Sequence, residues 1–220
     1  MGFPLYWQIA ESARIEEHFV KEISEGVGAN KVKCGIIKIA TTRGTITPSE
    51  ENALRAAARV HKKLGVGITT HTDPEGWQET NIGLKQAEIL LSEGADPSRC
   101  VIGHACGTPN ISYLLSIVEK GFTVGIDRIG LIRPPLLPTD EIRVALVAAL
   151  VASGHADKIV LSLDHQTVWV PRFPREIASA KTLSYLFTDF VPKLRKAGLS
   201  QATIDQIMVD NPRRILSFPG

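Results

Sequence analysis

The sequence of 220 residues has no long apolar run, no marked excess of either charge and few cysteines. Its apolar stretches fall well short of the ~18 residues that a membrane-spanning helix needs. The net charge is +2, and acidic and basic residues are mixed throughout, without a basic stripe or an acidic tail. We therefore expect a protein that binds neither nucleic acid nor a membrane.

The three cysteines, Cys34, Cys100 and Cys106, lack CxxC spacing, and an odd number cannot all pair within one chain. The first residues show no basic segment followed by an apolar core, so we predict no signal peptide. Reduced thiols and the lack of a leader predict a cytoplasmic protein.

Short runs rich in Ile and Val alternate with segments of helical pattern, most of which end on glycine. Five runs have strand character: GIIKIATT (35–42), VGITTHT (66–72), CVIGHA (100–105), TVGID (123–127) and KIVLSLD (158–164). Helices are predicted over 10–25, 48–65, 78–94, 110–121, 139–154, 181–197 and 200–208. The alternation predicts an α/β protein with a parallel sheet, and no linker divides it, so we expect a single domain over residues 1–220.

The number of βα units bears on whether the sheet can close into a barrel. Five βα units are fewer than the eight that close a (β/α) barrel. The chain therefore represents a piece of a larger barrel, is completed by another chain, or forms an open sheet. The two end strands would expose unpaired backbone groups and apolar faces, which predicts a homo-oligomer or another form of self-association.

Four residues that can bind metals lie at or near the C-terminal ends of these runs: Lys38, His71, His104 and Asp164. The first three are one βα unit apart, roughly 30 residues, and Asp164 follows two units later. Parallel strands place all their C-terminal ends on one face, where α/β barrels build their active sites. Each residue alone has an ordinary explanation, such as a snorkelling lysine, a core histidine or a capping aspartate. Their shared register favours a metal site.

The chemistry of these four side chains supports the same interpretation. Burial of Lys38 in an apolar strand should lower its pKa, and a neutral amine can react with CO2 to form a carbamate whose oxygens can bridge two metals. The imidazoles of His71 and His104 suit Zn²⁺ and similar ions. Asp164 offers a carboxylate that can bind a metal and accept a proton. Together these groups describe much of a two-metal hydrolase centre.

The order and spacing of several longer stretches are more specific than any single motif. They are GIIKIATT (35–42), AAARVHKKLGVGITTHT (56–72), LLSEGADPSRCVIGHACGTPNISYL (90–114), GFTVGIDRIGL (121–131), HADKIVLSLDH (155–165) and NPRRILSF (211–218). In these stretches the chain resembles the phosphotriesterase family of the amidohydrolase superfamily, including its lactonase-like members. The resemblance covers nearly the whole sequence and implies a TIM-type (β/α) barrel, of which the five βα units correspond to strands 4–8.

The resemblance also implies roles for individual residues. Lys38 resembles the bridging N6-carboxylysine, His71 and His104 resemble the ligands of the more exposed of two divalent ions, typically Zn²⁺, and Asp164 resembles the aspartate that binds the buried ion and shuttles a proton. Arg128 resembles the arginine at the base of the substrate pocket in lactonase-like members, although Asp127 and Arg128 could instead form a structural ion pair. Trp169, in the long loop after Asp164, is a candidate for the pocket wall.

Two departures from the family pattern bear on activity. The family begins with a strand that carries an HxH motif for the buried ion, and this sequence contains no HxH. One of the two ions could therefore be lost. Cys106 lies two residues after His104, where many members carry acidic residues; an inert small side chain is the simpler interpretation than a ligand.

The expected function is metal-dependent hydrolysis by an activated hydroxide. The expected substrate is a small uncharged ester, namely an organophosphate triester, a lactone or a related ester, and GIDRIGL favours the lactone slightly. The alternatives are a truncated, non-catalytic remnant and a subunit that needs another chain to supply the HxH strand.

Overall fold

A computed structural model of the chain describes residues 5–42, 44–72, 81–131, 137–165 and 182–218. It contains a five-stranded sheet in which every neighbouring pair is parallel and the strands follow chain order. The strands are β1 (Ile37–Ala40), β2 (Ile68–His71), β3 (Cys100–Ile102), β4 (Thr123–Ile126) and β5 (Ile159–Leu161). All five predicted strands are present, although each is shorter than its apolar run. Strands β1 and β5 form the two edges.

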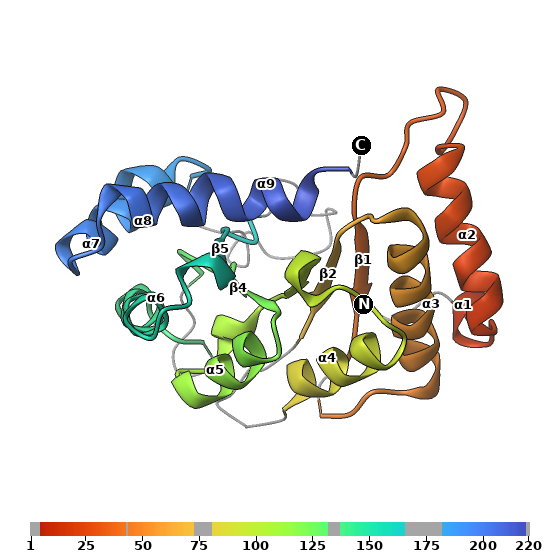
Figure 1. Cartoon of the computed structure of the whole chain (residues 1–220), viewed down its shortest axis with the longest axis horizontal. Helices are drawn as coiled ribbons and strands as arrows, with labels where there is room; N and C mark the ends of the chain where they lie inside the picture. Colours follow the sequence, from red (N-terminus) through yellow and green to blue (C-terminus); the bar gives the residue numbers. More distant parts are fainter. Residues whose placement is uncertain (1–4, 43, 73–80, 132–136, 166–181, 219–220) are drawn as a thin grey trace, which may run out of the picture.

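The helices of the βα units cover one side of this sheet (Figure 1). They are α3 (Pro48–Leu64), α4 (Ile82–Ser92), α5 (Ile111–Glu119) and α6 (Asp140–Ala152), whereas α1 (Leu5–Gln8) and α2 (Ser12–Ser24) precede β1. Helix α3 packs on β1 and β2, α4 on β3, and α5 on β4, while α2 forms an outer layer against α3. None of the described helices combines the length and the apolar composition of a membrane-spanning segment.

Helix α3 shows how closely local sequence sets the element boundaries. The side chain of Thr47 accepts from the backbone N–H of Glu50, and Glu50 accepts in return from the backbone of Thr47. Pro48 occupies the first turn, where its missing N–H costs nothing. The helix ends at Gly65, whose φ of 69° is the left-handed conformation that glycine adopts most easily. The predicted limits of this helix are therefore confirmed.

The C-terminal segment is helical for longer than its sequence indicates. It contains η5 (Leu186–Phe190), α7 (Val191–Lys196), α8 (Gln201–Asp205), η6 (Gln206–Asp210) and α9 (Asn211–Leu216). We predicted that the last helix ends near residue 208, before the NPRR stretch. Instead the helix continues to Leu216, because the widened turn of η6 directly precedes Pro212 and accommodates a residue that lacks an N–H.

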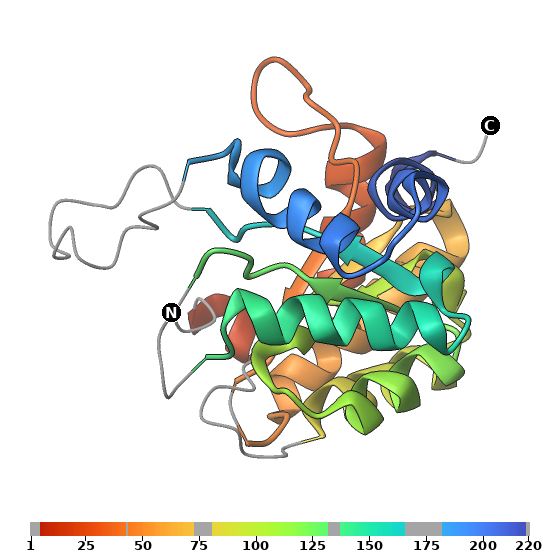
Figure 2. The ribbon, with the colours of Figure 1, turned by 90° about the vertical axis from the view of Figure 1, so that its left-hand side faces the viewer.

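Helix α9 crosses the N-terminal ends of the strands. Arg214 donates to the carbonyls of Ser98 and Asp157, just before β3 and β5. Asn211 is fully buried and donates to Ala156 and Ile159 at the start of β5. In Figure 2 the same C-terminal helices, coloured blue, are seen above α6 and α5. This end of the sheet is therefore closed by backbone-directed hydrogen bonds.

The side of the sheet opposite the helices is partly open. In β1, Ile37 and Ile39 are buried against the helices, whereas Lys38 and Ala40 face the other way and are exposed. Ser162, just after the other edge strand, is exposed as well. Parallel sheets are normally covered on both faces, so this open side is where the fold leaves room for a ligand or for further chain.

Candidate active site

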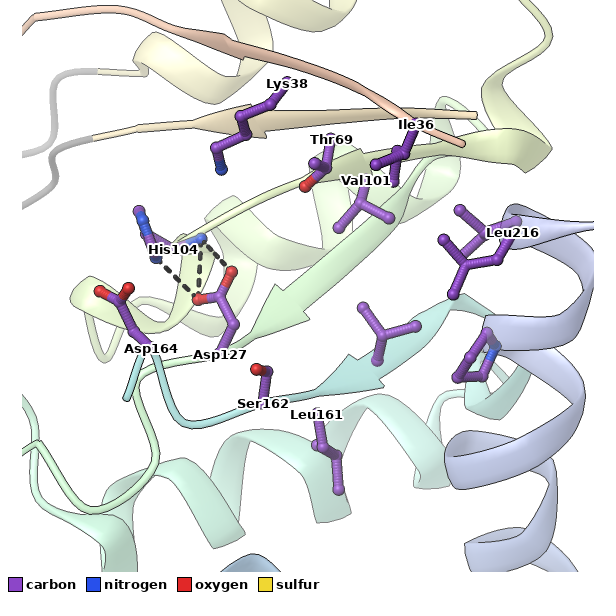
Figure 3. A pocket seen from close by; sticks show the side chains of 13 residues that line it. Ile36, Lys38, Thr69, Val101, His104, Asp127, Leu161, Ser162, Asp164 and Leu216 are labelled. Atoms are coloured by element: carbon purple, nitrogen blue, oxygen red, sulfur yellow. Dashed lines mark hydrogen bonds and ion pairs between the residues drawn. The ribbon is translucent and has the colours of Figure 1, made fainter. Parts of the chain in front are cut away.

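A pocket of about 390 Å³ runs along the open side of the sheet. One end is polar, and the other is apolar where α9 crosses the sheet (Figure 3). The polar end is lined by Lys38, His104, Asp127, Ser162 and Asp164, and the apolar end by Ile36, Val101, Val160, Pro212, Ile215 and Leu216. The polar end coincides with the C-terminal ends of the strands, where the sequence predicts the site.

His104 is held by the carboxylate of Asp127. Its ring Nδ1 lies 2.9 Å from Asp127 Oδ1, and its backbone N–H donates to both carboxylate oxygens at 3.0 Å (Figure 3). These hydrogen bonds hold the pKa of Asp127 below its ordinary value, although burial alone would raise it. Because an ionised carboxylate only accepts, Nδ1 carries a proton, so in the neutral form of the ring the lone pair is on Nε2. A metal-binding histidine is typically oriented in this way.

His71 lies directly beside His104. Their ring centroids are 4.5 Å apart and the rings meet edge to face, at 87°. His71 is the last residue of β2, and its ring is partly exposed. The two imidazoles that the sequence assigns to one ion therefore lie next to each other, although they come from strands separated by a whole βα unit.

Lys38 points into the same pocket from β1. The residue as a whole is exposed, but its Nζ donates to the carbonyl of Thr70 at 2.9 Å. Desolvation by the pocket wall lowers the pKa of Lys38, while the charges of Asp127 and Asp164 oppose this and Arg128 adds to it. The direction agrees with the expectation for a lysine whose amine must lose its proton before it can react with CO2.

Asp164 and Arg128 form an ion pair at the far side of the polar end, with 3.5 Å between Arg128 Nε and Asp164 Oδ2. The arginine is buried and the carboxylate is partly exposed. We considered Arg128 as the partner of its neighbour Asp127. That interpretation is wrong in its pairing, because Asp127 turns to His104 and Arg128 reaches Asp164.

Two of the candidate residues have strained backbones. His104 has a φ of 58° and Asp164 a φ of 48°, the left-handed region that residues other than glycine rarely adopt. Each conformation costs on the order of 1–2 kcal/mol relative to a right-handed one. Such strain concentrates at functional sites, where it aims a side chain in a direction that a regular strand does not allow.

Two glycines make room for Asp127. A Cβ built on Gly125 would lie 2.6 Å from Asp127 Oδ2, and one built on Gly103 would overlap the carbonyl oxygen of Thr70. These contacts mean that β2, β3 and β4 approach one another closely at their C-terminal ends. The carboxylate can fold back onto His104 only because both positions lack a side chain.

The structure thus brings Lys38, His104 and Asp164 to one pocket, places His71 against His104 and joins Arg128 to Asp164. Trp169, the predicted wall residue, lies outside the described residues. The sequence did not identify Asp127 as the partner of His104, although its position at the end of an apolar run was a usable signal. Within the described residues, no three His, Cys, Asp or Glu side chains are arranged to hold an ion by themselves.

A parallel α/β fold with polar residues at the C-terminal ends of its strands is the arrangement on which α/β-barrel enzymes build their active sites. A family model then gives a specific assignment, since the model of the phosphotriesterase family matches residues 8–216. The chain belongs to the phosphotriesterase family.

Individual relatives agree. The chain is 33% identical to an aryldialkylphosphatase of Saccharolobus solfataricus, over 99% of this chain and 68% of that protein. It is 32% identical to a phospho-furanose lactonase of Mycoplasmopsis synoviae, over 96% and 61%. A solved structure described as organophosphate hydrolysis activity engineered from a weak promiscuous lactonase template superimposes with a TM-score of 0.86, at 32% identity, over 98% of this chain and 69% of its own. The chain therefore spans about three fifths to two thirds of the length of these relatives, all of which are named for hydrolytic activities.

Proposed function

We propose that this chain carries the metal site of a hydrolase that acts on small uncharged esters. The observation that carries the proposal is the arrangement of two imidazoles, with His71 against His104 and His104 oriented by Asp127. An imidazole whose Nδ1–H is committed to a carboxylate presents Nε2 as a more basic ligand. A histidine with a purely structural role does not require a second imidazole beside it.

The donor set fits one divalent ion, with Zn²⁺ as the preferred candidate. His71 and His104 supply two nitrogen ligands, and Lys38, once carboxylated, supplies the oxygen ligand that the described His, Cys, Asp and Glu residues do not provide alone. The lowered pKa of Lys38 supports this modification. Lys38 and Asp164 could contribute to holding a second ion, which would lack the ligands of an HxH strand in this sequence.

The protein residues have separate tasks in hydrolysis. A bound divalent cation supplies Lewis acidity, which polarises the scissile carbonyl or phosphoryl group and makes water nucleophilic at neutral pH. Asp164 is placed to accept a proton at the open side of the pocket. The guanidinium of Arg128, beside Asp164, is placed to position the substrate. The apolar end of the pocket suits an aliphatic or aryl substituent and disfavours a charged one.

Organophosphate triesters, lactones and related esters all fit this description. The relatives carry names from both of the first two groups. Arg128 within GIDRIGL resembles lactonase-like members, so we place lactones first. An uncharged ester with an apolar arm is the common chemical feature.

A second candidate is a subunit that becomes active only when further chain covers the open side of the sheet. We propose that the five strands correspond to strands 4–8 of an eight-stranded barrel. The exposed residues of β1 and the open edges of β1 and β5 favour this candidate. The same edges support self-association of copies in isolation.

Metal analysis of the purified chain, combined with assays on a lactone and on an aryl dialkyl phosphate, tests the proposal. About one Zn²⁺ per chain with ester turnover supports the enzyme. One Zn²⁺ without turnover, followed by turnover on addition of a polypeptide that supplies three further βα units, supports the subunit. No bound ion at saturating Zn²⁺ and bicarbonate contradicts both.

A further inference from the structure

A fully buried amide reaches the candidate site from the helical layer. Gln86 lies in α4, and its buried side chain reaches residues at the ends of β1 and β2. Its Nε2 donates to Thr41 Oγ1 at 2.8 Å and to the carbonyl oxygen of His71 at 2.9 Å. Both acceptors are at the C-terminal edge of the sheet, next to the pocket.

The orientation of this amide follows from its surroundings. The His71 carbonyl can only accept a hydrogen bond, so the nitrogen and not the oxygen of Gln86 must face it. Oε1 then has no partner among the described residues. Gln86 thus contacts the backbone of His71 through its donor, while its acceptor is buried without a partner among the described residues.

The carbonyl of His71 receives two further contacts. The backbone N–H of Thr41 donates to it at 3.2 Å, and Thr41 Oγ1 lies 3.4 Å away. Strand β1 ends at Ala40, whose Cα pairs with that of His71, so these contacts extend the β1–β2 ladder past its last regular pair. Gln86 braces this extension from outside the sheet.

Similar side-chain bonds continue across the edge to His104. Thr70 Oγ1 accepts from the N–H of Gly103, and Thr72 Oγ1 donates to the carbonyl of Gly103 at 2.7 Å. The next residue is His104, whose N–H is bound by Asp127. The backbones of both histidines are therefore positioned by side chains where regular strand pairing stops.

We propose that Gln86 is a positioning residue that sets the backbone of His71 and so brings its ring against His104. The part of this proposal that concerns metal affinity rests on the proposed function; the part that concerns ring placement does not. Loss of the Nε2 donor removes the shortest of the three contacts that hold the His71 carbonyl, and a carbonyl that rotates moves the attached Cα and its ring.

The chain offers a matched control at the opposite end of the sheet. Asn211 is also fully buried and also donates its amide to two acceptors, the carbonyls of Ala156 and Ile159 at 2.8 and 2.7 Å. It lies far from the polar end of the pocket. A general loss of stability would follow from either substitution, whereas a change at the histidines should follow only from that of Gln86.

The first measurement needs no metal. In the metal-free protein, rings with centroids 4.5 Å apart should give a nuclear Overhauser effect between the ring protons of His71 and His104. We expect Gln86→Met, which keeps about the same length and has no donor, and Gln86→Glu, which has no donor when ionised, to reduce this cross-peak at least twofold. Asn211→Asp and Asn211→Leu should leave it unchanged. The Met and Leu pair keeps the test valid if a buried carboxylate prevents folding.

The second measurement is Zn²⁺ titration of the same variants in bicarbonate buffer. We expect the Gln86 variants to bind Zn²⁺ at least tenfold more weakly and the Asn211 variants to match the unmodified chain, because loss of a supporting contact typically weakens metal binding 10- to 100-fold. An unchanged cross-peak or unchanged affinity in the Gln86 variants overturns the proposal, as does an equal loss in the Asn211 variants. If the unmodified chain binds no Zn²⁺ but the Gln86 variants lose the cross-peak, the proposed function fails and the positioning role stands.

Discussion

The two ends of the sheet use similar polar residues for opposite purposes. At the N-terminal end, Asn211, Arg214 and His61 direct their polar atoms to backbone groups, and the part of the pocket that reaches α9 is lined by apolar side chains. At the C-terminal end, Lys38 and Asp164 point into a pocket. One end therefore holds the strands together, while the other directs polar side chains into the pocket.

The backbone conformation also differs between the two ends of the sheet. At the C-terminal end, His104 and Asp164 adopt left-handed conformations at a cost in stability. At the N-terminal end, the positive φ values near the strands belong to glycines such as Gly65 and Gly121. Among the described residues, the other non-glycine residues with positive φ, Lys31 and Asn81, lie in connecting segments, so at the strand ends this conformation coincides with candidate functional groups. The comparison teaches that burial and polarity alone do not identify a site; the direction of the polar atoms does.

The largest expected effect separates two buried histidines, one at each end. His104→Ala should weaken Zn²⁺ binding at least ~100-fold, because it removes one of the two imidazoles that we propose as ligands. His61 lies between the carbonyl of Val66, 2.7 Å from Nδ1, and the N–H of Asp96, 3.0 Å from Nε2. His61→Ala should lower the free energy of unfolding by about 1–3 kcal/mol through these lost bonds and leave Zn²⁺ affinity unchanged.

Calorimetric Zn²⁺ titration and urea unfolding of both variants measure the difference. Weakened Zn²⁺ binding in His61→Ala comparable to that in His104→Ala would remove the distinction between the two ends.

The next effect concerns the carboxylate behind His104. Asp127→Asn keeps the shape of the side chain but weakens its charge-assisted bond to Nδ1 and no longer selects one tautomer. We expect Zn²⁺ affinity to fall about 10- to 100-fold. Zinc titration monitored by a competing chelator measures this effect, and an affinity equal to that of the unmodified chain would show that Asp127 serves packing only.

Two glycines give a sharper version of the same test. A Cβ on Gly125 would lie 2.6 Å from Asp127 Oδ2, and a Cβ on Gly67 would lie 2.5 Å from the carbonyl of Ile215 in α9. Both Gly→Ala changes overpack the interior, which typically costs about 1–3 kcal/mol. Gly125→Ala should in addition weaken Zn²⁺ binding, because it displaces the carboxylate, whereas Gly67→Ala should not. Thermal unfolding with and without Zn²⁺ distinguishes them, since only Gly67→Ala should keep the full stabilisation by the ion.

The smallest effect lies outside the pocket, in the ion pairs between α3 and the end of α4. Hydrogen bonds from Arg59 and Arg55 lower the pKa of Glu93 from 4.5 to about 2. The carboxylate therefore contributes stability fully above pH 4.5, and this contribution is lost as the pH falls from 4.5 through about 2. Both arginines are partly exposed, so solvent screening keeps the contribution below about 1 kcal/mol.

Glu93→Gln should remove part of the acid sensitivity in that window and leave the unfolding free energy near neutral pH only slightly lower. Urea unfolding between pH 2 and 5 measures the difference. An identical pH profile for the variant would show that other carboxylates account for acid unfolding.

Much of the fold could be predicted from the sequence. Runs of Ile and Val mark all five strands, and Thr47, Pro48 and Gly65 mark the limits of α3, because capping and strand preference are local properties. The extent of α9 was not predictable in this way. In the sequence, Pro212 indicates the end of a helix. In the structure, the wide turn of η6 precedes Pro212 and accommodates it.

The same division holds for the site. Lys38, His104 and Asp164 could be assigned to one face from the βα spacing alone, since parallel strands end together. The hydrogen-bond partner of His104 could not be predicted from this spacing. Asp127 has an adjacent arginine as its obvious local partner, and only the close approach of β3 and β4 at Gly103 and Gly125 turns its carboxylate toward the imidazole.

The sequence by itself determined the parallel α/β architecture, the family and the register of the four ligand-type residues, because each depends on patterns within one βα unit or on their spacing. Tertiary structure alone decided which groups meet: Asp127 with His104, Arg128 with Asp164 and Gln86 with the carbonyl of His71. These contacts join residues whose separation along the chain carries no information about their distance in space. They depend on how far each strand extends and on which side chains are small enough to let neighbouring strands approach.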